Sequence, residues 1–308
     1  MKWLLENGAP VNFRDDTQGT TALYWAVKGE SIDSIRMLLN HGAQVRLPRT
    51  EHKNLLHVAV KTGKVEIVNL LCEHGGDVNE PRDRFGETPL FRAVRANNFE
   101  MVGRLIELGS SVNSFSNDFL TPLHLAAGNV HKNIDILQLL LDNGALVNCK
   151  DCRGHIPFVT CLRTSIGDIL YKGATQSICE CLVRHGSLVN DEHSHDVLEW
   201  QATHLACYSL VKLCVAAGLD LYKGRWSSLF ARDSSSQNDT AGYVSASERE
   251  DMENFIQFHL RNPRLLADSC RITIRTYLSG IYEGASIYYH IQKLPLPESM
   301  VLFLLLEE

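Results

Sequence analysis

The sequence has no long apolar segment and no block of positive charge. Its longest uninterrupted apolar run is Met300–Leu306, whereas a membrane-spanning helix needs roughly 20 apolar residues. Its first residues lack the charged, apolar and small-residue order of a signal peptide, so we expect neither a membrane protein nor a secreted one. A net charge of −6 without a Lys/Arg-rich block also argues against nucleic-acid binding.

The cysteines and the short motifs exclude further classes. The nine cysteines are odd in number and scattered, which indicates reduced thiols in a reducing compartment. We therefore expect a cytoplasmic protein, with the nucleus also open. Neither a glycine-rich phosphate loop nor a Gly-x-Ser-x-Gly motif occurs, so nothing in the sequence points to an enzyme or to a bound cofactor.

What the sequence does contain is a repeat. A Gly-x-x-Val-Asn-like ending recurs at steps of 34, 33, 34, 35, 42 and 32 residues. A period near 33 residues is the ankyrin signature. The glycines of the seven endings are Gly8, Gly42, Gly75, Gly109, Gly144, Gly186 and Gly218.

A second mark, Thr-Pro-Leu-His or a variant of it, follows most of these glycines by about thirteen residues. It reads Thr21-Ala-Leu-Tyr24, Asn54-Leu-Leu-His57, Thr88-Pro-Leu-Phe91, Thr121-Pro-Leu-His124 and, more weakly, Ile156-Pro-Phe-Val159. With this mark the chain resembles the ankyrin-repeat family. The resemblance implies a solenoid of helix pairs joined by short fingers, which is stable only through stacking of neighbouring pairs.

Each mark has a mechanical reason. Thr88 and Thr121 can accept hydrogen bonds from the unpaired N–H groups at a helix start, and proline at the first helical position loses no hydrogen bond there. Glycine just past the second helix, as at Gly144, tolerates the left-handed conformation that ends helices.

The repeats and a polar stretch divide the chain into three parts. We expect an array of about six ankyrin units over residues 1–221, of which the first is truncated and the last two are degenerate. The polar sequence within residues 222–250 predicts a linker, because it is low in apolar content. Residues 251–308 form the third part, so the predicted fold class is all-α.

Two short motifs mark the third part. Leu266, Cys270 and Ile274 recur every four residues, which places them on one stripe of a helix. Farther on stands the sequence Leu294-Pro295-Leu296-Pro297. With Ile274-Arg275, these motifs resemble a SOCS box, and with the repeats the whole chain resembles the ankyrin-repeat and SOCS-box family of ubiquitin-ligase receptors.

The resemblance implies partners and a fold for this part. In that family a three-helix box binds the elongin B/C pair through its first helix and a cullin, usually cullin five with its RING subunit, through the Leu-Pro segment. Carried onto this sequence, Leu266, Cys270 and Ile274 would contact elongin and Leu294–Pro297 would contact the cullin. The chain departs from the family pattern at Leu265, Ser269 and Val301.

The opposing interpretation is a helical cap that only covers the last ankyrin unit. Against it stands the apolar run Met300–Leu306, because a monomer rarely exposes such a patch without a partner to cover it. We expect Met300, Phe303 and Leu304 to pack the last helix onto the first helix of the box.

Two histidines and a group of cysteines are the remaining candidates for catalysis or metal binding. For His57 and His124 we favour hydrogen bonds to a capping hydroxyl or a neighbouring backbone group over catalysis. A zinc site is the competing interpretation of the cysteines, since zinc prefers Cys and His ligands; buried thiols that fill space are the one we favour, and we predict no metal. The residues concerned are Cys149, Cys152, His155, Cys161, Cys179 and Cys181.

A target protein is expected on the fingers and on the slot after Thr-Pro-Leu-His. Trp25 and Arg92 occupy that slot, and Arg49, Phe115 and Phe119 lie on fingers. Aromatic residues and arginine are frequent anchors of protein interfaces. The sequence therefore predicts a non-catalytic ligase adaptor for an unknown protein substrate; the alternative is an ankyrin scaffold that works without a ligase.

Overall fold

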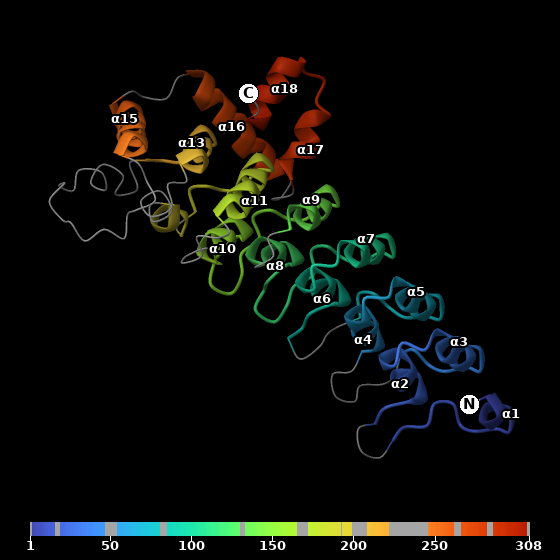
Figure 1. The fold of residues 1–308 in the computed structure, drawn as a ribbon. Coiled ribbons are helices and arrows are strands. Elements are labelled where there is room, and N and C mark those ends of the chain that lie inside the picture. Colours follow the sequence, from blue (N-terminus) through green and yellow to red (C-terminus); the bar gives the residue numbers. More distant parts are fainter. Residues whose placement is uncertain are drawn as a thin grey trace, which may run out of the picture. The chain divides into compact units, whose positions relative to one another are not determined.

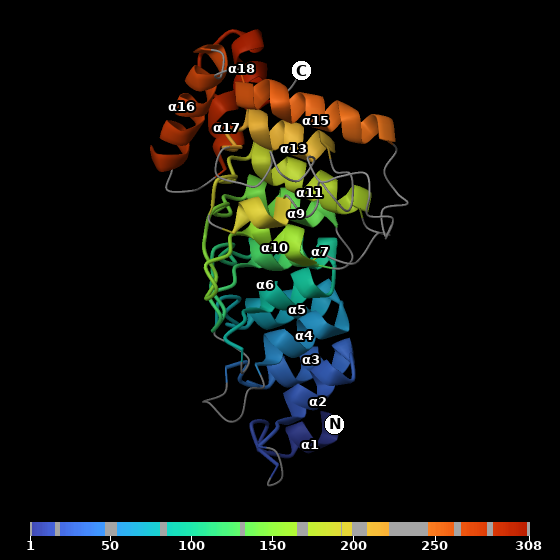
Figure 2. The same ribbon diagram turned by 90° about the vertical axis from the view of Figure 1, so that its left-hand side faces the viewer.

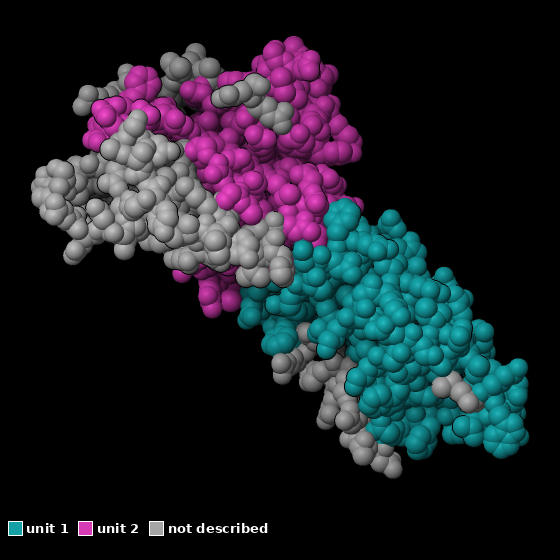
Figure 3. Space-filling view, in the orientation of Figure 1, with its two compact units in different colours: residues 1–125 teal, residues 126–308 magenta. Residues whose placement is uncertain are grey.

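The computed structural model describes residues 2–15, 19–46, 54–80, 85–129, 133–164, 172–191, 193–198, 208–221, 246–261, 266–281 and 286–306. These residues belong to two compact units, Met1–Leu125 and Ala126–Glu308 (Figure 3). Every secondary-structure element of the described ranges is a helix, which confirms the all-α prediction. None of these helices is both long enough and apolar enough to cross a membrane.

The first unit is a stack of paired helices (Figure 1). Each pair packs on the next, and the fingers of this unit project to one side of the pairs (Figure 2). The helices are α1 (Lys2–Glu6), α2 (Ala22–Lys28), α3 (Ile32–Asn40), α4 (Leu55–Thr62), α5 (Val65–Glu73), α6 (Pro89–Arg95) and α7 (Phe99–Glu107). Helix α8 (Pro122–Gly128) crosses the boundary between the units.

The second unit holds the later pairs together with the C-terminal helices. Its ankyrin part comprises α9 (Ile134–Asp142), α10 (Pro157–Thr164), α11 (Lys172–Arg184), a short helical segment at residues 194–198, and α13 (Tyr208–Ala216). Its C-terminal part comprises α15 (Ala246–Arg261), α16 (Leu266–Ile281), α17 (Ile287–Gln292) and α18 (Glu298–Leu305).

The glycine period is confirmed in the backbone. All seven glycines of the repeat have φ between 82° and 115°, a left-handed conformation that a side chain disfavours. Each therefore ends an outer helix in the way the sequence predicts.

An asparagine in the fingers ties one unit to the next. Asn79 donates from Nδ2 to the Gly109 carbonyl at 2.8 Å and accepts the Ser111 N–H at 2.7 Å. The same pair of bonds joins Asn12 to Gly42 and Gln44. It also joins Asn148 to Gly186 and Leu188, and Asn190 to Gly218 and Asp220. The two degenerate units thus keep the bridge of the regular ones.

The inner helices begin where the second mark places them. Helices α6 and α8 start at their prolines, and the Thr121 hydroxyl accepts the His124 N–H at 3.4 Å. The prediction for Thr88 is wrong, because its hydroxyl caps no N–H and instead lies 3.4 Å from the Ser114 hydroxyl.

The two histidines of this mark are structural. His57 Nε2 lies 2.8 Å from the Glu87 carbonyl oxygen of the next unit, and His124 Nδ1 lies 2.9 Å from the Thr121 hydroxyl. Both side chains are buried. The favoured interpretation as hydrogen-bonding residues is confirmed.

The C-terminal helices have a small apolar core of their own. Ile287, Ile291, Leu304 and Leu305 are buried together, and the partly buried side chains that surround them are Leu278, Tyr288, Leu296, Val301 and Phe303. Helices α16, α17 and α18 contact one another around this core.

The predicted linker is only partly visible. Residues 222–245 lie outside the described ranges, and α15 begins at Ala246, before the predicted limit at residue 251. Met252 and Ile256 of α15 are buried. The Lys212 ammonium of α13 lies 5.4 Å from the centre of the Phe255 ring of α15, so α15 is joined to the last ankyrin pair.

Candidate functional site

Helix α16 has a buried face and an exposed one. Arg275 is only 5% exposed, and Leu278 packs against the core of the C-terminal helices. Ile274 precedes Arg275 by about 100° of helical rotation and is 37% exposed. Leu266 and Cys270 stand two turns and one turn before Ile274 in the backbone; their side chains fall outside what the structure describes.

Arg275 joins three elements. Its Nη2 donates to the Val183 carbonyl at 2.6 Å and to the Arg184 carbonyl at 3.3 Å, at the end of α11. Its Nη1 donates to the Leu304 carbonyl at the end of α18. Burial, together with the nearby Arg271, lowers the pKa of Arg275 to about 10, so the guanidinium remains charged at neutral pH.

Helix α17 meets the same end of α11. The Ile287 N–H donates to the His185 carbonyl at 3.1 Å, and the Tyr288 ring stacks on the His185 ring at a centroid distance of 4.8 Å. His185 Nδ1 lies 2.7 Å from the Cys181 carbonyl oxygen. Burial lowers the pKa of His185, against the opposing effects of that hydrogen bond and of Asp142. The His185 ring is therefore expected to be neutral at this position.

Two glycines allow the close approach of these helices. A Cβ on Gly186 would lie 2.8 Å from Ile287 Cγ1, and a Cβ on Gly218 would lie 3.2 Å from Ile272 Cγ2. The C-terminal helices are thus packed on the ends of α11 and α13, while the Ile274 side of α16 stays accessible.

The Leu-Pro segment forms a bend before α18. Leu294 and Leu296 are half-buried, whereas Pro295 and Pro297 are exposed. The Leu296 N–H donates to the Leu294 carbonyl at 2.8 Å, which makes a three-residue turn. Leu296 also packs against the C-terminal core. The segment presents its two proline rings to solvent.

The apolar run at the end of α18 is largely covered by the chain itself. Leu304, Leu305 and Leu306 are buried, and Met300 is 45% exposed. Phe303 packs against the core, and the Arg271 guanidinium of α16 lies 4.8 Å from the centre of its ring. The interpretation of this run as exposed is wrong for its C-terminal half, because α16 and α17 cover it. The packing predicted for Phe303 and Leu304 is confirmed, whereas the packing predicted for Met300 is wrong, because this side chain is exposed.

The candidate target-binding residues lie in the first unit. Trp25 and Phe115 are exposed and Arg92 is half-buried, while Arg49 lies outside the described residues. The Trp25 Nε1 donates to the Thr20 hydroxyl at 2.9 Å, and the Lys28 ammonium lies 4.7 Å from the centre of its ring. Its orientation is therefore fixed while its surface is free for contact.

Phe119 stands where other fingers have glycine. Gly19, Gly86 and Gly154 occupy the left-handed position two residues before the start of the inner-helix mark, and Phe119 has the same conformation with φ of 58°. Its side chain is nevertheless 59% exposed. Strained residues of this kind gather at functional sites. Phe119 was a candidate from its aromatic side chain, and its left-handed backbone conformation is a second signal, which a comparison of the finger sequences could have found.

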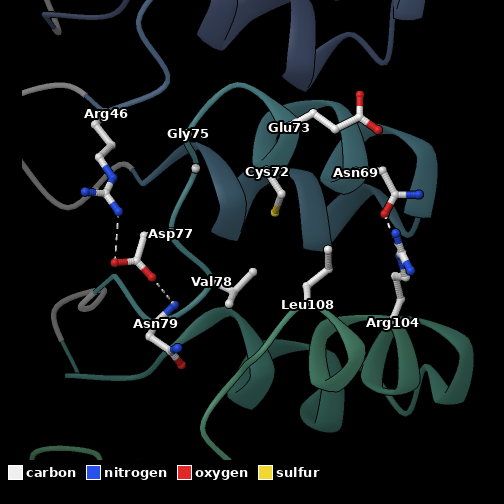
Figure 4. A pocket seen from close by; sticks show the side chains of 11 residues that line it. Arg46, Asn69, Cys72, Glu73, Gly75, Asp77, Val78, Asn79, Arg104 and Leu108 are labelled. Carbon is white, nitrogen blue, oxygen red and sulfur yellow. Dashed lines mark hydrogen bonds and ion pairs between the residues drawn. The ribbon is translucent and has the colours of Figure 1, made fainter.

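A shallow cavity of about 530 Å³ lies between α5, α7 and the finger that follows α5 (Figure 4). The Cys72 sulfur faces its interior, and burial raises the pKa of this thiol, so it stays protonated. Both arginines at its rim are engaged: Arg46 pairs with Asp77 at 3.0 Å, and Arg104 donates to Asn69 at 2.7 Å. The cavity offers no activated nucleophile.

The cysteines of the zinc alternative are separated. Cys161 and Cys179 are buried, whereas Cys152 is exposed. The Cys181 thiol lies 3.3 Å from Gln138 Oε1, and burial raises its pKa to about 12. Within the described ranges, no three His, Cys, Asp or Glu side chains are placed so that they could hold a metal ion.

Comparison with known families finds matches in two parts of the chain. Residues 1–82 and 56–151 match the family described as ankyrin repeats (3 copies), and residues 262–305 match the SOCS box. The chain has the domain architecture of the ankyrin repeat and SOCS box family. Helices α16, α17 and α18 therefore form the SOCS box.

Curated relatives share the repeats. The transient receptor potential cation channel subfamily A member 1 of Homo sapiens is 32% identical over 66% of this chain and 17% of its own length. Alpha-latrocrustotoxin-Lt1a of Latrodectus tredecimguttatus is 26% identical over 49% of this chain and 8% of its own length. The putative ankyrin repeat protein FPV232 of fowlpox virus is 37% identical over 58% of this chain and 37% of its own length. The chain therefore spans well under two thirds of each relative.

Proposed function

We propose that this chain is the substrate-recognition adaptor of an elongin–cullin–RING ubiquitin ligase. The elongin B/C pair binds the stripe Leu266, Cys270 and Ile274 on α16. A cullin, cullin five in our proposal, binds the segment Leu294–Pro297 together with its RING subunit. The ankyrin units bind a protein target through the finger side, for which the candidate residues are Trp25, Arg49, Arg92, Phe115 and Phe119.

The observation that supports the proposal is that one part of the α16 surface is held in the protein while another part is exposed. Arg275 fixes the helix in the protein through its bonds to α11 and α18, while Ile274, about 100° of helical rotation away, is 37% exposed. An aliphatic stripe on a fixed helix suits a groove in a partner. Burial of each Leu or Ile contributes about 1.5–3 kcal/mol, so Leu266 and Ile274 together contribute about 3–6 kcal/mol toward a micromolar affinity of about 8 kcal/mol.

The proposed mechanism is geometric and involves no bond chemistry in this chain. One end holds the target and the other holds the ligase, so a target lysine meets the charged ubiquitin carrier at a raised effective concentration. The protein is accordingly a receptor and not an enzyme.

The alternative, a ligase-independent scaffold, is favoured by one observation. Ile272 and Ile287 lie against Gly218 and Gly186, so the SOCS box also covers the end of the ankyrin array. Capping and ligase binding use different sides of the box, however, and the capping contacts leave Ile274 accessible. The ligase adaptor and the ligase-independent scaffold are therefore distinguished by whether the chain binds elongin B/C.

Co-purification of the full chain with elongin B/C tests the proposal. We expect elongin B/C to be retained by the wild type and lost from Leu266→Ala and Cys270→Ala. Thr276→Ala, at an exposed position of α16 away from the stripe, is the matched control and should retain it. Equal retention by all variants would contradict the proposed site and favour the scaffold function.

The cullin contact is tested separately. Pro295→Ala combined with Pro297→Ala changes only exposed residues of the segment, so this variant should keep elongin B/C and lose cullin five. Proximity labelling of the wild type against this variant would then identify targets, because ligase-dependent targets accumulate with the variant.

A further inference from the structure

Arg275 caps the ends of two helices with one side chain. Val183 and Arg184 are the last two residues of α11, and Leu304 is the next-to-last residue of α18. The final carbonyl groups of a helix have no partner within the helix and carry its partial negative charge. A buried cation at this point satisfies both ends, and the planar guanidinium can serve several carbonyls at once.

Further contacts converge on the same end of α11. The Ile287 N–H bonds the His185 carbonyl, Tyr288 stacks on the His185 ring, and the Ile287 side chain lies against Gly186. Two helices of the SOCS box, α16 and α17, are therefore attached to one short stretch of the pair α10–α11, which is the fifth complete ankyrin unit.

We propose that Arg275 is a positioning residue, which locks the elongin-binding helix α16 to the end of α11 so that the SOCS box and the fifth ankyrin unit move as one body. The inference rests on the proposed ligase function for its purpose. A fixed box holds the ligase in one direction relative to the end of α11, whereas a hinged box would let that direction vary.

The lock has a measurable consequence. Arg275 links α16 to the carbonyl groups at the end of α11. A partner that stabilises α16 should therefore also reduce local unfolding at the end of α11. The reporters are the amides of Gly186 and Ser187, which close the last turn of α11, and the amide of Ile287.

Hydrogen exchange of the full chain, free and saturated with elongin B/C, tests the lock. In the free state, Arg275→Met should speed exchange of these amides by about ten- to a hundredfold, because each charge-assisted bond lost accounts for about a factor of ten. In the complex, elongin should slow their exchange in the wild type and not in Arg275→Met. The affinity for elongin B/C should change by less than about threefold, since Arg275 lies off the stripe.

Arg271→Met is the matched control. Arg271 is on the same helix with the same charge, but it pairs with Asp268 at 2.6 Å and lies over Phe303, so its loss should leave α11 exchange unchanged. If Arg275→Met does not fold, Arg275→Lys carries the test, because an ammonium cannot match the fork and exchange should be intermediate.

Three results would overturn the inference. They are unchanged α11 exchange in the Arg275 variants, the same change in Arg271→Met, or an elongin effect on α11 that survives in Arg275→Met. The measurements without elongin test the lock even if wild-type chain binds no elongin, in which case the proposed function fails and the lock does not.

Discussion

Replacement of Gly186 by alanine tests whether the SOCS box packs on the fifth ankyrin unit as described. Gly186 and Gly144 end equivalent helices with φ of 97° and 82°. A Cβ at either position costs about 1–2 kcal/mol in this conformation. At Gly144 nothing lies within 4 Å of the new atom, whereas at Gly186 it would lie 2.8 Å from Ile287 Cγ1 and 3.0 Å from Cδ1.

The clash adds about 1–3 kcal/mol, as overpacking of a tight contact usually does. Gly186→Ala should therefore lower the free energy of unfolding by about 2–5 kcal/mol and Gly144→Ala by about 1–2 kcal/mol. Urea unfolding followed by circular dichroism measures both. In the double variant Gly186→Ala/Ile287→Ala the clash is absent. Its loss of unfolding free energy should therefore be smaller than the sum of the losses in the two single variants. Equal costs for the two glycines would refute the packing.

The remaining predictions concern the finger bridge, the buried histidine and the core. Asn148→Ala removes the bonds to Gly186 and Leu188 and should cost about 1–3 kcal/mol in urea unfolding; an unchanged midpoint would contradict the bridge. Burial lowers the pKa of His185, so the unfolded chain binds the proton first and stability should fall as pH drops below the ordinary value of about 6.5. The loss of thermal midpoint between pH 7.5 and 5.5 should shrink in His185→Gln, and a slope equal to the wild type would count against this assignment. Phe91 is 1% exposed, so Phe91→Ala should lower the free energy of unfolding by about 3–5 kcal/mol. Phe115 is exposed, so Phe115→Ala should leave the free energy of unfolding nearly unchanged.

The repeat could be predicted from the sequence because its marks are local. A glycine past a helix and a proline at a helix start have fixed backbone roles, so a period of about 33 residues gives the helix pairs directly. The seven glycines and the starts of α6 and α8 follow that prediction. Thr88 departs from it because its hydroxyl faces Ser114 instead of a backbone N–H.

The attachment of the SOCS box could not be predicted in the same way. Arg275 binds main-chain carbonyls, one of them 92 residues away, and a carbonyl has no sequence signature. Gly186 is explained by the left-handed conformation at the end of α11, so nothing else in the sequence indicated its contact with Ile287. Composition also cannot tell whether a protein covers an apolar run with its own helices or leaves it for a partner. The end of the run, Leu305 and Leu306, was therefore expected to be exposed, although it is buried.

The affinity of elongin B/C for the Ile274→Asp variant tests the central claim most directly. Ile274 is 37% exposed, so the charge should leave the thermal midpoint nearly unchanged. If the stripe on α16 is the ligase contact, calorimetry should give micromolar or tighter binding to the wild type and at least about a hundredfold weaker binding to the variant, because the charge enters an apolar groove. Equal binding by both proteins, or none by the wild type, would contradict the account.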